Sequence, residues 1–174
     1  MAEMTEKEEQ IKKLAEMIKD IDFAMLTTVA ADGTLHSRPM STQPVEFDGE
    51  LWFFTRASAA KVGEIEGEHQ VNVSYAKPED QCYVSVSGRA TVVRDRAKIE
   101  ELWSPELKAW FPKGLEDPDI ALLKVSAERA EYWDSPSSAV AHAVSFVKAI
   151  VTGTPASPGE NEKIELKKSA QSER

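Results

Sequence analysis

The chain has 174 residues and a mass of 19.3 kDa, with 41% hydrophobic and 29% charged residues, which is typical of one globular domain with a sizeable core. Its 21 basic and 30 acidic side chains leave a net charge of −9. This acidic surface would repel nucleic acid and anionic lipid, and no basic stripe offsets it. Cys82 is the single cysteine, which excludes an intramolecular disulfide.

The amino terminus is acidic and polar, unlike a secretory signal. No apolar run reaches the ~18 residues of a membrane-spanning helix. The longest run, 139–151, is interrupted by His142 and Lys148. We therefore expect a cytoplasmic protein that binds neither membrane nor nucleic acid.

Hydrophobic periodicity predicts the elements, because helices place apolar residues three or four apart and strands alternate them. The predicted order is a helix at 5–20, strands at 23–29, 35–45 and 51–55, a helix at 59–66, strands at 70–76 and 83–93, a helix at 95–103, strands at 121–125 and 130–133, and a helix at 139–152. The pairs Asp32-Gly33 and Asp48-Gly49 predict hairpin turns, since glycine accepts positive φ. Gly88, inside a strand, predicts a bulge.

These elements predict a mainly β protein with flanking helices (α+β). Antiparallel strands joined by short turns would expose two long edges in an open sheet, and closure removes those edges. We expect a six-stranded antiparallel Greek-key barrel in a single domain, 1–152. Residues 153–174 begin with a stretch rich in Pro, Gly, Ser and Thr, which predicts a flexible C-terminal tail.

Common catalytic motifs are absent from the sequence, which has no GxGxxG, GxxxxGK[ST], HExxH or GxSxG. The three histidines are scattered, and the single cysteine is predicted to begin a strand. A hydrolase built on a side-chain nucleophile and base is therefore disfavoured, and no metal site is expected.

The most informative segment is 51–65, where an apolar run ends in a polar cluster and a helical pattern follows. A strand that opens into a helix N-terminus presents free backbone N–H groups to an anion. Arg56 and Lys61 add positive charge there, and Thr55 and Ser58 add hydroxyls. Taken alone, the segment is explained somewhat better by an ordinary strand–helix junction with Ser58 as the N-cap.

A second polar and basic cluster, at 35–42, changes this balance. A hairpin around residues 48–49 would pair its strand with 51–55 and bring Arg38 beside Lys61. Two cations, two hydroxyls and a helix N-terminus at one point favour phosphate binding over a purely structural role.

Nearby side chains could also hold a flat ring. Met40, Ser41 and Phe54 lie on the strands that flank the predicted phosphate site. Four tryptophans are numerous for 174 residues, and Trp110 lies in an irregular segment of the kind in which function concentrates. Packing in the core or in a dimer interface explains Trp110 and Trp133 equally well.

Six short segments in this order and spacing resemble the flavin-binding split-barrel family typified by pyridoxamine 5′-phosphate oxidase, and within it the general stress protein 26 branch. The resemblance runs from about residue 11 to residue 166. The segments are 37–40 (Ser-Arg-Pro-Met), 51–55 (Leu-Trp-Phe-Phe-Thr) with Lys61, 87–90 (Ser-Gly-Arg-Ala), 110–112 (Trp-Phe-Pro), 131–134 (Glu-Tyr-Trp-Asp) and 159–163 (Gly-Glu-Asn-Glu-Lys).

The resemblance implies a split barrel that binds FMN between the two subunits of a homodimer. It implies that the 5′-phosphate is held by Arg38, Thr55, Ser58 and Lys61, with Arg56 adding charge. By the same analogy Met40, Ser41 and Phe54 lie along the ring, Trp133 approaches FMN from the partner subunit, and Trp110 borders the cleft.

One departure separates this chain from the oxidases of the family. After the tryptophan that corresponds to Trp133, the oxidases carry an Arg-x-His that grips the pyridoxal substrate, whereas here Asp134 and Ser135 follow. The chain therefore does not resemble a typical pyridoxamine 5′-phosphate oxidase.

Three functions remain open at this point. The first is an FMN-dependent oxidoreductase that acts on a small molecule or takes electrons from a small-molecule donor. The second is a stress protein that binds flavin as a carrier or sensor without turnover. The third is a related flavin or another ligand, such as a deazaflavin or haem, in the same barrel.

Overall fold

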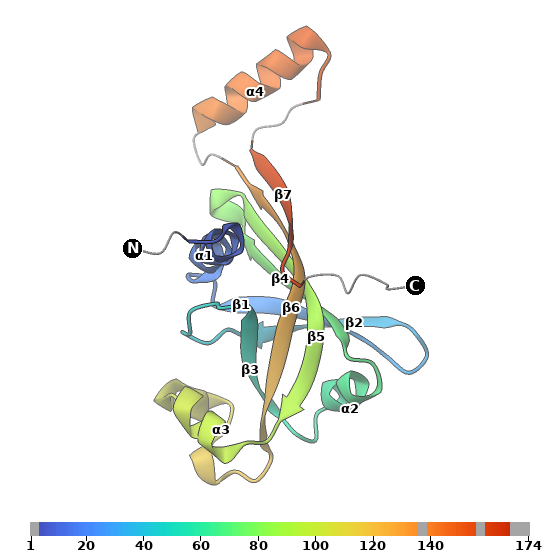
Figure 1. Cartoon of the computed structure of the whole chain (residues 1–174), viewed down its shortest axis with the longest axis vertical. Helices are drawn as coiled ribbons and strands as arrows, with labels where there is room; N and C mark the ends of the chain where they lie inside the picture. The colour runs from blue at the N-terminus through green and yellow to red at the C-terminus, as the bar shows by residue number, and fades with distance from the viewer. Residues whose placement is uncertain (1–3, 136–138, 156–158, 168–174) are drawn as a thin grey trace.

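The computed structural model describes residues 4–135, 139–155 and 159–167, and in them one antiparallel sheet curls into a half-barrel flanked by helices (Figure 1). Neighbouring strands follow the order β2-β1-β4-β5-β6-β3, and β7 pairs with β6 beside this path. The strands are β1 (Phe23–Val29), β2 (Leu35–Ser41), β3 (Glu50–Arg56), β4 (Gln70–Lys77), β5 (Cys82–Val93), β6 (Ile120–Asp134) and β7 (Glu160–Glu165). The helices are α1 (Glu6–Ile18), α2 (Ala60–Gly67), α3 (Arg96–Leu102) and α4 (Ala139–Thr152), with 3-10 turns η1 (Pro78–Asp80), η2 (Pro105–Ala109) and η3 (Gly114–Glu116).

Local sequence explains several of these boundaries. Thr5 caps α1, since its side chain accepts from the backbone N–H of Glu8 while the Glu8 carboxylate accepts from the backbone N–H of Thr5. Gly33 adopts a φ of +84° in the β1–β2 turn, as the Asp-Gly pair predicts. The predicted bulge is confirmed, because the β5–β6 register shifts between Ser87 and Gly88.

The predicted pairing of the second and third strands is wrong. β2 pairs with β1 and β3 pairs with β6, with Phe53 opposite Leu123. The connection between β2 and β3 is too long for a tight hairpin, and it buries Phe47 in the main core. Burial of this large ring holds the connection against the barrel and directs β3 to the far edge of the sheet.

Two further differences concern the C-terminal part. The predicted strands at 121–125 and 130–133 are two halves of one strand, β6. Residues 160–165, which the composition assigns to a flexible tail, form β7 through a full register with β6. Ile164 is buried there under α1, which explains why this polar segment is held. Residues 156–158 and 168–174 lie outside the described part of the chain.

Two apolar clusters meet on β3. Its Phe53 faces the main core inside the barrel, with Leu14 and Ile18 of α1. Its Phe54 faces a second cluster that α3 and the η2 turn build outside the barrel. Since both faces of this strand are buried, its sequence is a continuous apolar run rather than an alternation.

The helix α4 stands away from the rest of the molecule (Figure 1). Four of its large apolar side chains are exposed: Phe146, Val147, Ile150 and Val151. No helix in the described residues is both long and apolar enough to cross a membrane.

The bulge at Gly88 yields the first prediction. A Cβ atom at this position would lie 2.2 Å from the backbone O of Ser126, and backbone cannot move aside cheaply. We expect Gly88→Ala to lower the free energy of unfolding by about 1–3 kcal/mol, the usual cost of overpacking. Urea unfolding measures this change.

The control is Gly63→Ala in α2, where a Cβ meets no atom within 4 Å. This change should leave stability unchanged or raise it by up to about 1 kcal/mol, because alanine favours helix. Equal effects of the two substitutions would contradict the steric argument.

Candidate functional site

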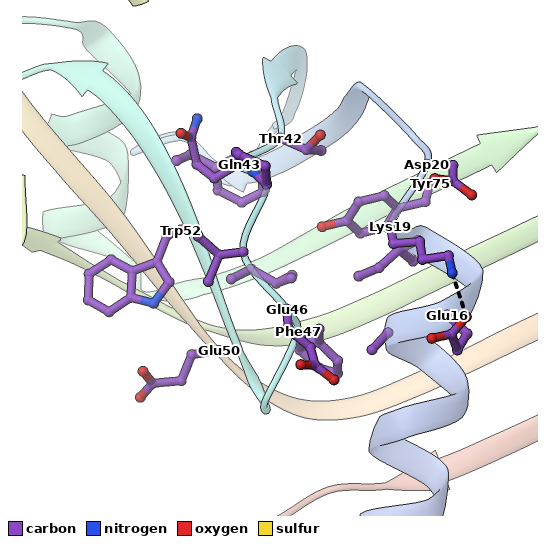
Figure 2. A pocket seen from close by; sticks show the side chains of 16 residues that line it. Glu16, Lys19, Asp20, Thr42, Gln43, Glu46, Phe47, Glu50, Trp52 and Tyr75 are labelled. Atoms are coloured by element: carbon purple, nitrogen blue, oxygen red, sulfur yellow. Dashed lines mark hydrogen bonds and ion pairs between the residues drawn. The ribbon is translucent and has the colours of Figure 1, made fainter. Parts of the chain in front are cut away.

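A cavity of about 330 Å³ lies where the ends of β2 and β3 meet α2 and the η2 turn. Seven of the ten predicted site residues line it: Met40, Ser41, Phe54, Thr55, Arg56, Lys61 and Trp110. The remaining lining side chains are Phe23, Pro39, Gln43, Ala59, Leu107 and Phe111. A larger cavity of about 490 Å³, between α1 and β3, includes none of the predicted residues (Figure 2). The smaller cavity is therefore the candidate site.

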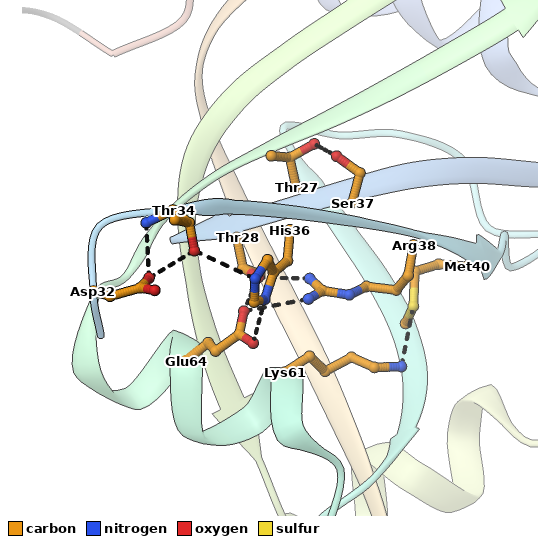
Figure 3. A network of polar contacts seen from close by, with 10 residues as sticks. All are labelled: Thr27, Thr28, Asp32, Thr34, His36, Ser37, Arg38, Met40, Lys61 and Glu64. Atoms are coloured by element: carbon orange, nitrogen blue, oxygen red, sulfur yellow. Dashed lines mark hydrogen bonds and ion pairs between the residues drawn. The ribbon is translucent and has the colours of Figure 1, made fainter. Parts of the chain in front are cut away.

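Arg38 lies behind this cavity in a polar network that joins β1, β2 and α2 (Figure 3). Its Nη1 donates to Thr28 Oγ1 (2.6 Å) and its Nη2 donates to Glu64 Oε2 (3.2 Å). Glu64 also accepts from Thr28 and contacts His36 Nδ1 (3.0 Å). The hydroxyl of Thr28, the imidazole of His36 and the charge of Arg38 hold the pKa of Glu64 at about 2. Arg38 is thus already neutralised by a carboxylate.

Two cations line the cavity, Arg56 and Lys61, and Lys61 is the one without an acidic partner among the described residues. It stands in the first turn of α2, and its Nζ contacts Met40 Sδ at 3.4 Å (Figure 3). No carboxylate forms an ion pair with it among the described residues. Burial lowers the pKa of its ammonium, and the nearby Arg38 lowers it further. A half-buried cation without a counter-charge favours binding of an anion.

The start of α2 adds backbone donors to this position. Its N-cap is Ala59, which provides no side-chain hydrogen bond. The N–H of Val62 donates to the backbone O of Ala59, whereas the N–H groups of Ala60 and Lys61 have no acceptor among the described residues and remain available to a ligand. The alternative that Ser58 caps the helix is therefore wrong.

Arg56 and Ser58 form their polar contacts with residues of the segment that precedes β6. Arg56 Nη1 lies 3.3 Å from Asp117 Oδ2, and its Nη2 donates to the backbone O of Trp110 (2.8 Å). Ser58 donates to Asp119 Oδ2 (2.6 Å), and this contact lowers the pKa of the Asp119 carboxyl. Arg56 therefore tethers the Trp110 segment at the cavity wall, and Ser58 lies outside the cavity.

Aromatic packing shapes the apolar part of the cavity. Phe54 contacts Trp103 and Phe111 edge to face, with centroids 6.0 and 6.3 Å away. Trp110, next to this cluster, keeps 59% of its surface exposed at the cavity mouth. Thr55 is buried in the wall, and its hydroxyl is 3.4 Å from the backbone O of Arg56. The pocket thus combines an aromatic wall with a cationic end.

Trp133 does not line the cavity. It pairs with Tyr83 across β5 and β6, on the outer face of the sheet, and both side chains are about 40% exposed. Phe23 and Met25 are exposed on β1. These four side chains form what we call the outer apolar patch, and Phe23 links it to the cavity.

The carboxylates that hold the cations in place were not predicted from the sequence. Glu64 lies three residues after Lys61 on α2. This spacing places both side chains on the same helix face, the face predicted to approach Arg38, and could have indicated Glu64. Asp117 and Asp119 offered no such signal, because they reach Arg56 and Ser58 only through the pairing of β3 with β6. The described residues contain no group of three side chains suited to holding a metal ion.

Comparison with known proteins supports a family assignment. The model of the family described as pyridoxamine 5′-phosphate oxidase like matches residues 9–156. Protein bli-3 of Neurospora crassa is 29% identical over 159 residues, covering 86% of this chain and 76% of that protein. The general stress FMN/FAD-binding protein of Xanthomonas citri is 30% identical and covers 75% of this chain and 92% of the other, with a TM-score of 0.65.

A protein of Clostridium acetobutylicum, related to general stress protein 26 and of the pyridoxinephosphate oxidase family, shares the fold with a TM-score of 0.69 at 17% identity. The match covers 91% of this chain and 96% of the other. The fold and the site thus define a small antiparallel split barrel with a cationic pocket at its strand ends. The chain belongs to the pyridoxamine 5′-phosphate oxidase-like family, which confirms the family and the split barrel expected from the sequence.

The Glu64 network yields a prediction on stability and pH. Replacing Glu64 with Gln removes charge-assisted hydrogen bonds, so the free energy of unfolding at pH 7 should fall by about 1–3 kcal/mol. The pKa of Glu64 in the folded protein, about 2, lies below the ordinary glutamate value of 4.5. The stabilisation is therefore complete above pH 4.5 and is lost as the pH falls toward 2. Urea unfolding across this range should show the two proteins converging at low pH.

Glu66→Gln serves as the control. Glu66 is exposed, and the substitution removes only its ion pair with Arg94, in which Nη2 of Arg94 lies 3.5 Å from Oε1 of Glu66. Its effect should stay within about 0.5 kcal/mol. A cost of Glu64→Gln that does not change with pH would show that the carboxylate charge is not the source of the stabilisation.

Proposed function

We propose that the chain is an FMN-binding flavoprotein that acts as an oxidoreductase on a small molecule. The observation that carries the proposal is Lys61, an ammonium without a counter-charge beside the free N–H groups of α2, at the end of an aromatic-walled cavity. A phosphate fits the cationic end, and a flat ring fits between Met40 and Phe54. The FMN/FAD-binding relative of Xanthomonas citri supports the choice of a flavin.

Different residues would contact different parts of FMN. Lys61 would bind the phosphate, with the N–H groups of Ala60 and Lys61 as further donors, while Arg38, paired with Glu64, would hold β2 against α2 behind the site. Phe54 and Trp110 would exclude water from the ring. The flavin, when bound, supplies hydride and electron transfer, so the protein needs no acid–base motif of its own.

We further propose that the active form is a homodimer with the flavin between the subunits. The outer apolar patch supports this, because exposed Phe23, Met25, Tyr83 and Trp133 on one sheet face are typical of an interface. Pairing of two such faces by a two-fold axis would bring Trp133 of each protomer toward the cavity of the other.

A non-catalytic carrier or sensor is the alternative, and one observation favours it. Among the residues that the structure describes, the cavity lining carries two charged side chains, Arg56 and Lys61, and no further charge to bind a substrate. Steady-state turnover with NADH or NADPH and a panel of acceptors separates the two functions. A bound flavin that stays oxidised with every reductant would contradict the oxidoreductase.

The phosphate contact yields a binding prediction. Loss of a charge-assisted hydrogen bond costs roughly 1.5–3 kcal/mol, so Lys61→Ala should weaken FMN binding by about 10- to 100-fold. Riboflavin lacks the phosphate, so its affinity should be nearly unchanged by Lys61→Ala. Titration followed by flavin fluorescence measures both affinities.

Lys12→Ala is the matched control, because it removes the same charge from the exposed face of α1. Equal weakening of FMN and riboflavin would mean that Lys61 acts through the fold. The visible spectrum tests the wider proposal, since a colourless protein that takes up no added FMN would overturn it.

The dimer yields a complementation prediction. Lys61→Ala and Trp133→Ala should each weaken FMN binding when present in both subunits. In a mixed dimer one of the two sites keeps both native residues, so unfolding and refolding an equal mixture should restore about a quarter of the native sites. Flavin titration of the mixture counts them. Failure to recover any site would contradict the contribution of Trp133 in trans.

A further inference from the structure

The larger cavity, of about 490 Å³, is a separate feature of the molecule (Figure 2). It lies between α1, the connection from β2 to β3, and the inner faces of β3 and β4. Its apolar walls are formed by Ala15, Ile18, Val45, Phe47, Leu51 and Phe53. Both its volume and its apolar lining are typical of small-molecule sites.

The polar group inside this cavity is the hydroxyl of Tyr75. Only 3% of the surface of Tyr75 is exposed, and its hydroxyl oxygen has no hydrogen-bond partner among the described residues. Figure 2 shows the hydroxyl end of the ring directed toward the middle of the lining side chains. Burial raises the pKa of this phenol, which therefore stays a neutral donor. A buried donor without a partner favours a ligand that carries an acceptor.

The rim of the cavity is acidic. Two of its carboxylates are paired, Glu16 with Lys19 (2.7 Å) and Glu50 with Lys124 (3.7 Å). The other two, Asp20 and Glu46, form no ion pair in the described part of the chain. Free carboxylates at the mouth, on a chain of net charge −9, attract cations and repel anions.

We propose that this cavity binds a small organic cation. The apolar body of the ligand occupies the space beside Phe47 and Phe53, its ammonium lies at the rim, to which Asp20 and Glu46 each contribute a negative charge, and an oxygen at its other end accepts from Tyr75. This cavity is separate from the proposed flavin site, because neither Arg56 nor Lys61 of the smaller cavity lines it. Gln43 lines both cavities and makes them neighbours.

Three probes of one size test the proposal by isothermal titration of the full chain. Tyramine has an ammonium, an aromatic body and a distal hydroxyl, and should bind with a Kd of about 0.1–1 mM, as expected for so small a ligand. Phenethylamine lacks the hydroxyl and should bind about 3- to 10-fold more weakly. The anion 4-hydroxyphenylacetate should show no measurable binding.

Variants then assign the contacts. Tyr75→Phe should weaken tyramine about 3- to 10-fold and leave phenethylamine unchanged, which also shows that the cavity is intact. Tyr83→Phe, on the outer face, is the matched control and should change neither. The double variant Asp20→Asn/Glu46→Gln should weaken both amines about 3- to 10-fold, whereas Glu116→Gln, on the exposed surface, should not.

Three results would overturn the proposal. The first is equal affinity of the native chain for tyramine and for the acid, or no affinity for either. The second is tyramine binding that Tyr75→Phe does not weaken. If tyramine binds only after Phe146 and Ile150 of α4 are replaced by Asp, the cavity is filled by α4 of a second copy, and the small-molecule site is also overturned.

Discussion

The pairing of β3 with β6 is the constraint on which the rest of this structure depends. It places β3 at the edge of the curled sheet and buries both faces of that strand, with Phe53 inside the barrel and Phe54 in the outer cluster. The same pairing sets Arg56 opposite Ile120 and so brings the loop of Asp117 and Asp119 to the end of β3. One strand therefore forms the wall between two cavities, since its first residues line the larger cavity and its last residues line the smaller.

The charges around the smaller cavity follow a simple arrangement. Arg38 is neutralised by Glu64 and Arg56 by Asp117, while Lys61 has no acidic partner among the described residues. Two ion pairs thus position side chains at the cavity, and one of its cations remains for a ligand. Because the chain as a whole carries a net charge of −9, an uncompensated cation in a cavity is a favourable place for an anion on an otherwise acidic molecule.

Most of the fold could be predicted from the sequence because its signals are local. Capping at Thr5, the Asp-Gly turn at Gly33 and the bulge at Gly88 each depend on residues close in the chain. Which strands pair depends on contacts between residues distant in the chain. The burial of Phe47 in the connection between β2 and β3 favours the pairing of β3 with β6 over the expected hairpin of β2 with β3. Arg38 and Lys61 still come together, but through the packing of α2 against β1 and β2 rather than through the pairing of β2 with β3.

The sequence by itself determined the types of the elements, the order of the residues in the candidate site and the family to which the chain belongs. Short motifs and periodicity carry that information because they depend on side-chain type and spacing. Only the tertiary structure decided which cations are free, since Glu64, Asp117 and Asp119 reach their partners across strands that are distant in the chain. It also decided that Tyr75 is buried without a partner, because a cavity exists only where the packed elements leave space.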